Sequence, residues 1–214
     1  MNKLTDLHTK EFLALLASAA PAPGGGGAAA IAAAIAAALT SMLANLTIGK
    51  KKFIDHEGEI KELLQQAEYS RSRMLELAEA DAEVFSAFMS CYRMPKDNEE
   101  EKNLRAAAIC QAAKQAAEIP LEIAEESLRI MRLTARLAQI GNPNVITDGA
   151  VSALLARAAL RSSAYNILVN LKLTGDTEYS DILTQKVAQL EEEALQLERQ
   201  TLLVTDRVIG VSKK

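Results

Sequence analysis

Residues 28–48 read AAAIAAAIAAALTSMLANLTI and follow four consecutive glycines. Alanine and leucine are strong helix formers, so this stretch predicts a long helix. Its large apolar side chains recur at steps of four, four, three and four residues, and its flanks are small. This stripe consists of Ile31, Ile35, Leu39, Met42 and Leu46. We therefore expect a central core helix around which the other helices pack.

The same region has the length of a membrane-spanning helix, because no charged residue occurs between residues 12 and 48. Pro21, Pro23 and the glycine run interrupt it, and alanine is only weakly lipophilic. We expect a core helix and no membrane contact.

The segments on either side repeat their apolar residues with a helical period, and none alternates for long at period two. Pro120 is expected to open a helix, where its missing N–H has no cost. The predicted helices cover about residues 6–19, 26–49, 57–92, 98–117, 120–139, 147–173 and 177–208. The prediction is one all-α domain over residues 1–214, a bundle of long helices around the Ala-rich helix.

The composition argues against several classes of function. The net charge is −4 and no basic stripe is interleaved with aromatic residues, so we expect no nucleic-acid partner. The two histidines are isolated, and Cys91 and Cys110 lack CxxC spacing, so no metal site is expected. Residues 1–6 lack the apolar segment of a signal peptide. These features favour a cytoplasmic protein with reduced thiols.

A candidate ligand-binding loop, PAPGGGG at residues 21–27, precedes the Ala-rich helix. Glycine lets the backbone approach a ligand closely, and a helix N-terminus offers free N–H groups to an anion. A flexible hinge is the alternative, but four glycines after two prolines favour a ligand loop. The candidate binding residues are Pro23, Gly24, Gly25 and Gly26.

Asp81 is the first candidate catalytic residue, because it falls on an apolar helix face. Its neighbours on that face are Met74, Leu77, Ala78, Val84, Phe85 and Phe88. A buried carboxylate is unfavourable unless it is paired or functional, and burial raises its pKa. A structural ion pair with an arginine such as Arg105 is the alternative.

Polar residues on the predicted helix 147–173 form a second candidate region. A stripe of mostly small or polar residues indicates a polar cleft, and it comprises Asp148, Ser152, Leu155, Ala159, Ser162, Asn166 and Asn170. Asn142 and Asn144 add amide groups upstream. Asp148 alone is better explained as a first-turn carboxylate favoured by the helix dipole. Lys50, Lys51 and Lys52 are either solvated surface or a site for a polyanion such as a glutamate tail.

These pieces, in this order, resemble the cyclodeaminase/cyclohydrolase family. That family includes the cyclodeaminase half of formiminotransferase-cyclodeaminase and bacterial methenyltetrahydrofolate cyclohydrolases. The resemblance is carried by residues 21–27, 45–53, 81–85, 141–148 and 166–171. Two departures concern substrate preference more than fold: Gly27 stands where serine is common, and Arg161-Ser162-Ser163 replaces a more usual Gly-Ala stretch.

The resemblance implies a helical homodimer that binds folate in a cleft near the subunit interface. A seam on the last predicted helix also indicates helix pairing, and it comprises Val187, Leu190, Ala194, Leu197, Thr201, Val204 and Val208. We therefore expect a homodimer formed through long helices.

The resemblance also implies the chemistry. Hydrolysis of 5,10-methenyltetrahydrofolate adds water to an electrophilic amidinium carbon, and cyclodeamination of 5-formiminotetrahydrofolate forms that carbon as ammonia leaves. Both reactions need a carboxylate to stabilise the cation and move protons, and neither needs a metal or redox cofactor. Asp81 and Asp148 are the candidate catalytic carboxylates. We expect a cyclohydrolase; the alternatives are a cyclodeaminase and, in another class, a non-catalytic helical scaffold.

Overall fold

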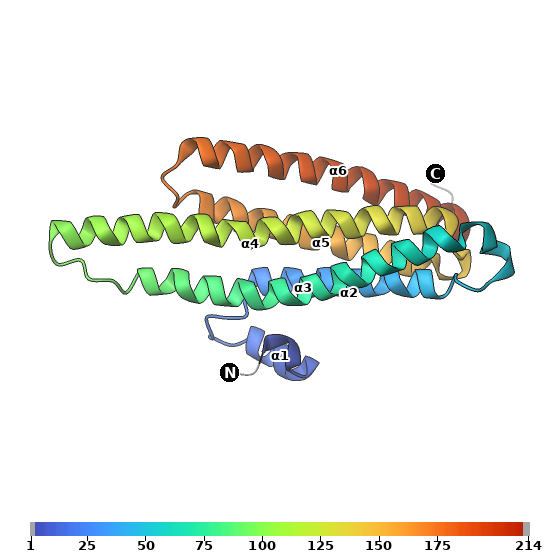
Figure 1. The fold of residues 1–214 in the computed structure, drawn as a ribbon, viewed down its shortest axis with the longest axis horizontal. Coiled ribbons are helices and arrows are strands. Elements are labelled where there is room, and N and C mark those ends of the chain that lie inside the picture. The colour runs from blue at the N-terminus through green and yellow to red at the C-terminus, as the bar shows by residue number, and fades with distance from the viewer. Residues whose placement is uncertain (1–2, 212–214) are drawn as a thin grey trace.

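The computed structural model describes residues 3–211 as a bundle of long helices (Figure 1). The elements are η1 (Leu4–Asp6), α1 (Thr9–Leu16), α2 (Gly25–Asn45), η2 (Lys51–His56), α3 (Glu57–Cys91), α4 (Glu99–Ile140), η3 (Pro143–Val145), α5 (Ile146–Leu171) and α6 (Thr177–Ile209). No strand occurs in this described range, so the all-α prediction is confirmed.

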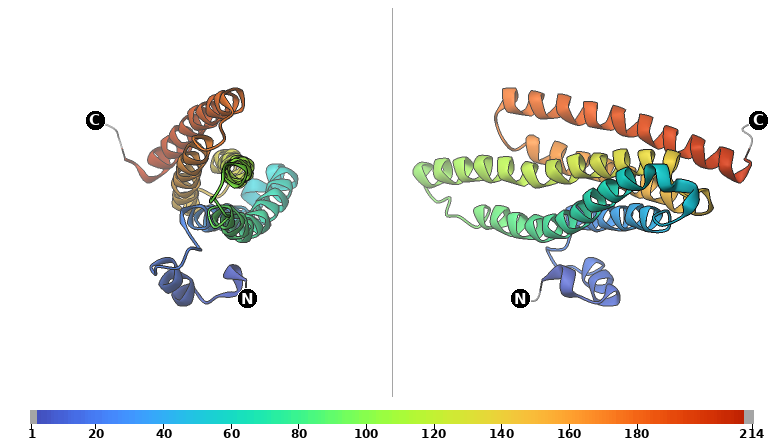
Figure 2. Two further views of the ribbon diagram at one scale, coloured as in Figure 1. Left: turned by 90° about the vertical axis from the view of Figure 1, so that its left-hand side faces the viewer. Right: turned by 45° about the vertical axis from the view of Figure 1, so that its right-hand side comes forward.

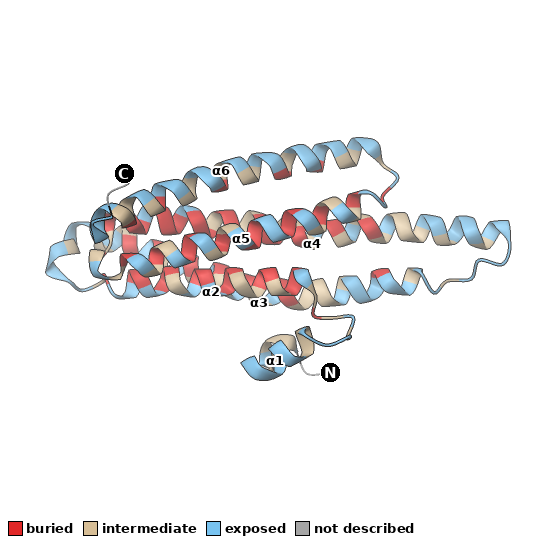
Figure 3. Ribbon diagram, turned by 180° about the vertical axis from the view of Figure 1, so that it is seen from behind, coloured by how far each residue is buried: buried red, intermediate tan, exposed pale blue. Residues whose placement is uncertain are grey.

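The helix α2 lies among α3, α4 and α5, and α4 packs against α2, α3, α5 and α6 (Figures 1 and 2). The elements η1 and α1 stand to one side of this body, and α1 has no buried residue. Figure 3 shows that buried residues concentrate where α2, α4 and α5 face one another, whereas the far ends of α3 and α4 are exposed.

The orientation of α2 reverses the prediction from its large-residue stripe. The buried side is made of small residues, chiefly alanines such as Ala30, Ala33 and Ala37. Ile35 and Met42 point outward, with 50% and 44% of their surfaces exposed. Small side chains let three neighbouring helices approach the α2 axis closely, so alanines fill most of the interior, with Leu43 buried among them and Ile31 and Leu39 partly buried.

By length and composition, α2 is the single helix in residues 3–211 that could cross a membrane. Of its most apolar window, 61% is buried inside the protein. This burial is that of a core helix, as the sequence predicted.

Four predicted helices differ from the structure. The predicted helix 6–19 is a 3-10 turn followed by the short α1. The predicted helices 98–117 and 120–139 are one continuous helix, α4, with Pro120 in its interior rather than at its start. The predicted Ala-rich helix 26–49 ends earlier, at Asn45. The chain between α2 and α3 includes the 3-10 helix η2.

The seam on α6 is used within the chain. Val187, Ala194 and Thr201 are buried, and α6 packs against α4 and α5 of the same chain. The seam therefore packs chiefly within the chain, and the homodimer formed through long helices stays a prediction.

The polar stripe predicted on α5 is divided between the core and the surface. Ser152 is fully buried and its hydroxyl lies 2.9 Å from that of Thr40 and 3.1 Å from that of Thr134. Ser152 also donates to the carbonyl of Ala36 at 2.8 Å. These bonds satisfy buried hydroxyls where α2, α4 and α5 meet, so Ser152 belongs to the core and not to a cleft.

Candidate active site

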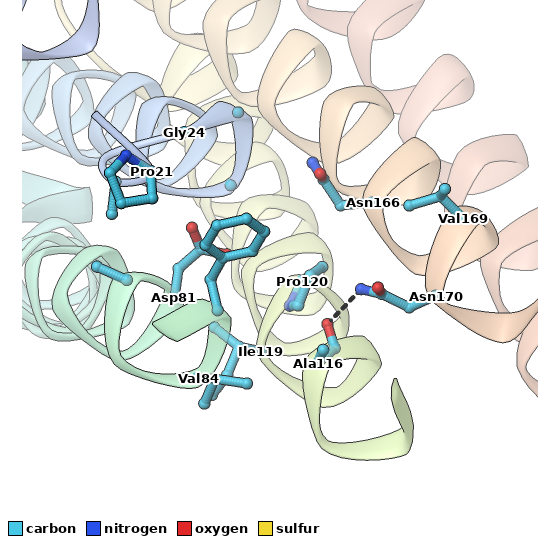
Figure 4. A pocket seen from close by; sticks show the side chains of 15 residues that line it. Pro21, Gly24, Asp81, Val84, Ala116, Ile119, Pro120, Asn166, Val169 and Asn170 are labelled. Atoms are coloured by element: carbon cyan, nitrogen blue, oxygen red, sulfur yellow. Dashed lines mark hydrogen bonds between the residues drawn. The ribbon is translucent and has the colours of Figure 1, made fainter. Parts of the chain in front are cut away.

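A cavity of about 280 Å³ opens where the N-terminus of α2 meets α3, α4 and the C-terminal half of α5 (Figure 4). Its wall consists of Pro21, Ala22, Gly24, Gly25, Gly26, Asp81, Ala82, Val84, Phe85, Ala116, Ile119, Pro120, Asn166, Val169 and Asn170. Four segments that are far apart in sequence contribute to it. The structure therefore brings the glycine loop, Asp81, Asn166 and Asn170 together, as the sequence predicted.

Asp81 is held by the first turn of α2. The Gly27 N–H donates to Oδ2 of Asp81 at 2.9 Å, so the carboxylate accepts one of the N–H groups that a helix N-terminus leaves free. The anion at this N-terminus is thus a side chain of the protein itself. Gly25 and Gly26, also in this first turn, line the cavity.

Gly26 has a specific steric role. A Cβ at this position would lie 2.0 Å from Oδ1 of Asp81, far inside contact distance. A Cβ on Gly24 would meet nothing within 4 Å. The close approach of the Asp81 side chain explains why residue 26 is a glycine. The structure gives no steric reason for a glycine at position 24. Pro23, also a predicted binding residue, is buried beneath the loop, where its Cβ would lie 3.6 Å from a Cβ on Gly27.

Burial raises the pKa of Asp81, and the hydrogen bond from Gly27 opposes this rise without cancelling it. Arg105, the ion-pair partner considered for Asp81, instead donates to the Tyr92 carbonyl at 3.2 Å and stacks over the Tyr92 ring. That alternative is wrong. Asp81 is therefore a desolvated carboxylate facing a cavity, which suits a group that takes up and releases a proton.

Two amides on α5 complete the polar lining. Asn166 Nδ2 donates to the Ser162 carbonyl at 3.0 Å, and Asn170 Nδ2 donates to the Ala116 carbonyl at 2.7 Å. Each side chain uses its nitrogen within the protein, and no described residue donates to its oxygen.

The sequence placed Val84 and Phe85 on the face of Asp81 without predicting them as site residues, and it gave no role to Ile119 and Val169. Phe85, 39% exposed, lines the cavity together with Val84, Ile119 and Val169. An aromatic ring here offers a flat face to a heterocycle. The spacing of Phe85 four residues after Asp81 places both on one helix face, and this signal could have identified it.

The charge of the lining is informative. Asp81 is the single charged residue in the wall, and none of the lining residues is Lys, Arg or His. A lone carboxylate in a small, largely apolar cavity favours a cationic group over an anionic one.

The other predicted site residues lie at the opposite end of the bundle. Asp148 and Asn166 are both on α5, and their separation in sequence corresponds to about 27 Å along the helix. Lys50, Lys51 and Lys52 are exposed at the same far end as Asp148, beside the start of η2. Within one chain, these residues do not join the cavity.

Asn142 has a structural role at that far end. It is 5% exposed, its N–H donates to Thr47 Oγ1 at 3.0 Å and its Nδ2 donates to the Leu46 carbonyl at 3.0 Å. Its Oδ1 accepts from the Asn144 N–H at 3.2 Å. Asn142 thereby joins the turn before α5 to the end of α2, and its polar atoms are occupied. Asn144 is exposed.

The side chains that could hold a metal ion are those of His, Cys, Asp and Glu. Within residues 3–211, no group of three or more His, Cys, Asp or Glu side chains is placed to hold an ion.

Comparison with known proteins identifies the family. A family profile described as Formiminotransferase-cyclodeaminase matches residues 8–189. A methenyltetrahydrofolate cyclohydrolase from Methylorubrum extorquens is 43% identical over 180 residues, which are 84% of this chain and 85% of that protein. The formimidoyltransferase-cyclodeaminase of Sus scrofa is 31% identical over 93% of this chain, which spans 36% of that longer enzyme.

The fold agrees. The crystal structure of a formiminotetrahydrofolate cyclodeaminase from Thermotoga maritima matches with a TM-score of 0.87 at 27% identity, covering 96% of this chain and 99% of that one. The resemblance inferred from the glycine loop and the Asp81 segment is thereby confirmed. The chain belongs to the formiminotransferase-cyclodeaminase family.

Proposed function

We propose that this protein hydrolyses 5,10-methenyltetrahydrofolate to 10-formyltetrahydrofolate. The observation that carries the proposal is the lone Asp81 carboxylate, with its raised pKa, in a cavity whose wall has no positive charge. The methenyl group is a cationic amidinium, so it is the kind of group that this cavity attracts. The relative from Methylorubrum extorquens, which bears the name of this activity, supports the assignment.

The geometry supports a simple sequence of proton transfers. Ionised Asp81 stabilises the amidinium and accepts a proton as water adds to the carbon between N5 and N10. The neutral adduct then opens: the C–N5 bond breaks, N5 receives the proton from Asp81, and the hydroxyl proton passes to solvent as the formyl C=O forms. One proton is released overall. The steps need no metal or redox cofactor. That the enzyme works without a cofactor is therefore part of the proposal.

The Gly27 N–H positions the carboxylate during this cycle. By donating to Oδ2 at 2.9 Å it fixes one oxygen and leaves Oδ1 as the atom that exchanges the proton. Phe85 and Ile119 supply an apolar surface for the pterin ring and limit the access of water.

The proposal includes a homodimer formed by the outer faces of α2 and α5, not by α6. These neighbouring helices expose Ile35 and Met42 on α2, with Leu46 just after its end, and Val151, Leu154 and Tyr165 on α5. The basic residues of α5 are paired with α6, since Arg157 faces Glu198 and Arg161 faces Glu191, and Arg161 also stacks over the Tyr165 ring. An exposed apolar face that runs along two helices is suited to pack against the same face of a second copy.

An antiparallel dimer would reunite the two halves of the predicted site. Ile35 lies midway along α2 between Gly25 and Leu46, about 15 Å from each. A two-fold axis near Ile35 would therefore carry the far end of one copy to the glycine loop of the other. The partner's Asp148 and its lysines at positions 50–52 would then approach the cavity, where the lysines can bind the glutamate tail of the folate. The cavity volume lies just below the range for complete ligand sites, roughly 300–1,000 Å³, which agrees with a site completed by a partner.

Formiminotetrahydrofolate cyclodeamination is the second candidate. It is favoured by the match to the Thermotoga maritima structure, which covers nearly all of both chains. The two reactions share the same amidinium carbon, and Asp81 can serve either of them.

Parallel assays of the purified protein separate these candidates. Loss of methenyltetrahydrofolate without added ammonia supports the cyclohydrolase, whereas release of ammonia from formiminotetrahydrofolate supports the cyclodeaminase. Absence of turnover with both substrates would restore the non-catalytic scaffold.

A further inference from the structure

Pro120 of α4 and Asn170 of α5 both line the cavity, and the Asn170 side chain makes up for a hydrogen bond that Pro120 removes from α4. Pro120 is buried in the interior of α4 and lines the cavity. Proline has no N–H, so the carbonyl four residues earlier, that of Ala116, loses its normal helical partner. The Asn170 side chain of α5 supplies the missing donor, with Nδ2 2.7 Å from the Ala116 oxygen (Figure 4).

This bond fixes which way the Asn170 amide faces. A carbonyl oxygen only accepts hydrogen bonds, so the atom of Asn170 that meets Ala116 must be the NH₂ group. Oδ1 is then turned from α4, and no described residue donates to it. The same reasoning applies to Asn166, whose Nδ2 donates to the Ser162 carbonyl at 3.0 Å. Two amide oxygens, one helical turn apart on α5, are therefore presented at the cavity wall as acceptors.

We infer that Pro120 is a positioning residue whose effect is to hold Asn170 Oδ1 as a fixed acceptor for paired N–H donors of the substrate ring. Together with Asn166, Asn170 favours a ring with an amino-pyrimidinone edge, in which an exocyclic NH₂ stands next to a ring N–H. The identity of the ring rests on the proposed function, but the acceptor arrangement does not. A 2-oxo analogue, which presents an oxygen in place of the NH₂, is discriminated against because two acceptors would face each other.

The alternative is that Asn170 only satisfies a carbonyl that Pro120 happens to expose. Pro120→Ala separates these readings, because an alanine N–H can bond to the Ala116 carbonyl within the helix. The Asn170 amide then loses its fixed partner and can rotate. We expect the thermal melting temperature of this variant to equal or exceed that of the parent, and its KM to rise by about two- to tenfold with little change in kcat, the loss typical of one hydrogen bond.

A double-mutant cycle gives the decisive comparison. Asn170→Leu alone is expected to lower the melting temperature and raise KM. In the Pro120→Ala background, Asn170→Leu should no longer lower the melting temperature but should still leave KM raised. If KM in the double variant returns to the parent value, Asn170 only serves the Ala116 carbonyl and the inference is overturned. Pro95→Ala and Asn103→Leu, at exposed positions outside the cavity, are the matched controls.

Inhibition by folic acid and by its 2-deamino-2-oxo analogue tests the ring edge without turnover at the reacting carbon. The parent protein should bind folic acid more tightly than the analogue, and Asn170→Leu should reduce this preference by about two- to tenfold. An unchanged preference in a folded Asn170→Leu variant would contradict the inference while leaving the cyclohydrolase assignment intact. Failure of methenyltetrahydrofolate hydrolysis in the parent would instead remove the proposed function.

Discussion

Oδ1 of Asp81 occupies the space that a side chain on Gly26 would need, since a Cβ there would lie 2.0 Å from that oxygen. The neighbouring Gly27 N–H donates to the other oxygen of the same carboxylate. Two residues of the glycine run therefore contact Asp81: Gly26 leaves space for its carboxylate, and the Gly27 N–H orients it.

Gly26→Ala should displace the Asp81 carboxylate and reduce turnover by about 10²–10⁴-fold, the contribution typical of a general base. The substituted helix should still form, because alanine is the stronger helix former. Steady-state kinetics and circular dichroism of the variant measure both effects.

Gly24→Ala is the matched control for that variant, because a Cβ on Gly24 meets nothing within 4 Å and the residue has negative φ. It should retain most of the parent turnover. Equal activity of the two alanine variants would show that Asp81 does not need the space at Gly26.

The pH dependence of kcat/KM should have an acid limb set by Asp81. The base must be ionised, and burial raises its pKa above the ordinary value of 3.8. Activity should therefore fall as pH decreases, with a midpoint above 3.8. A pH–rate profile checks this, and a midpoint at or below that of an ordinary carboxyl would assign the base elsewhere.

Asp81→Asn should stabilise the fold at neutral pH. A carboxyl whose pKa is raised on folding destabilises the native state when it is ionised in both states, and this penalty disappears as pH falls through the raised pKa. Asparagine is neutral throughout and its amide oxygen can still accept from Gly27. The melting temperature of the variant should exceed that of the parent at pH 7, and the difference should shrink toward zero below pH 3.8. A lower melting temperature at pH 7 would indicate a stabilising role for the charge.

A site shared between two copies can be tested by mixing two inactive variants. One carries Asp81→Asn, and the other carries alanine in place of Lys50, Lys51 and Lys52. In an antiparallel dimer, a mixed pair contains one intact site, so random exchange should restore about a quarter of the parent activity. Light scattering should show dimers throughout. No recovery in verified mixed dimers would mean that each site is built from one chain.

The fold class followed from residue types and period, but the orientation of α2 did not. A stripe of large residues was expected to face the core, and in the structure Ile35 and Met42 face outward while alanines pack inside. The tight spacing of three helices around α2 decides this, and such spacing is a tertiary property. Pro120 was assigned to a helix start for a similar reason, because the compensating donor, Asn170, comes from another helix.

About half of the candidate site was predictable. Asp81 was identified from its place on an apolar face, and Asn166 and Asn170 from their places on one stripe; all three line the cavity. Asp148 was grouped with them, although it lies about 27 Å along the same helix from Asn166. The predicted helix 147–173 already implied this separation, but the sequence did not show which end of it meets Asp81, and Ile119 and Val169 carried no chemical signal.

The rate of 5,10-methenyltetrahydrofolate hydrolysis by the parent protein and by Asp81→Asn, each corrected for the uncatalysed reaction, tests the central claim most directly. We predict clear acceleration by the parent and a turnover about 10²–10⁴-fold lower for the folded variant, with substrate binding retained. A folded Asp81→Asn protein with parental turnover would contradict the account.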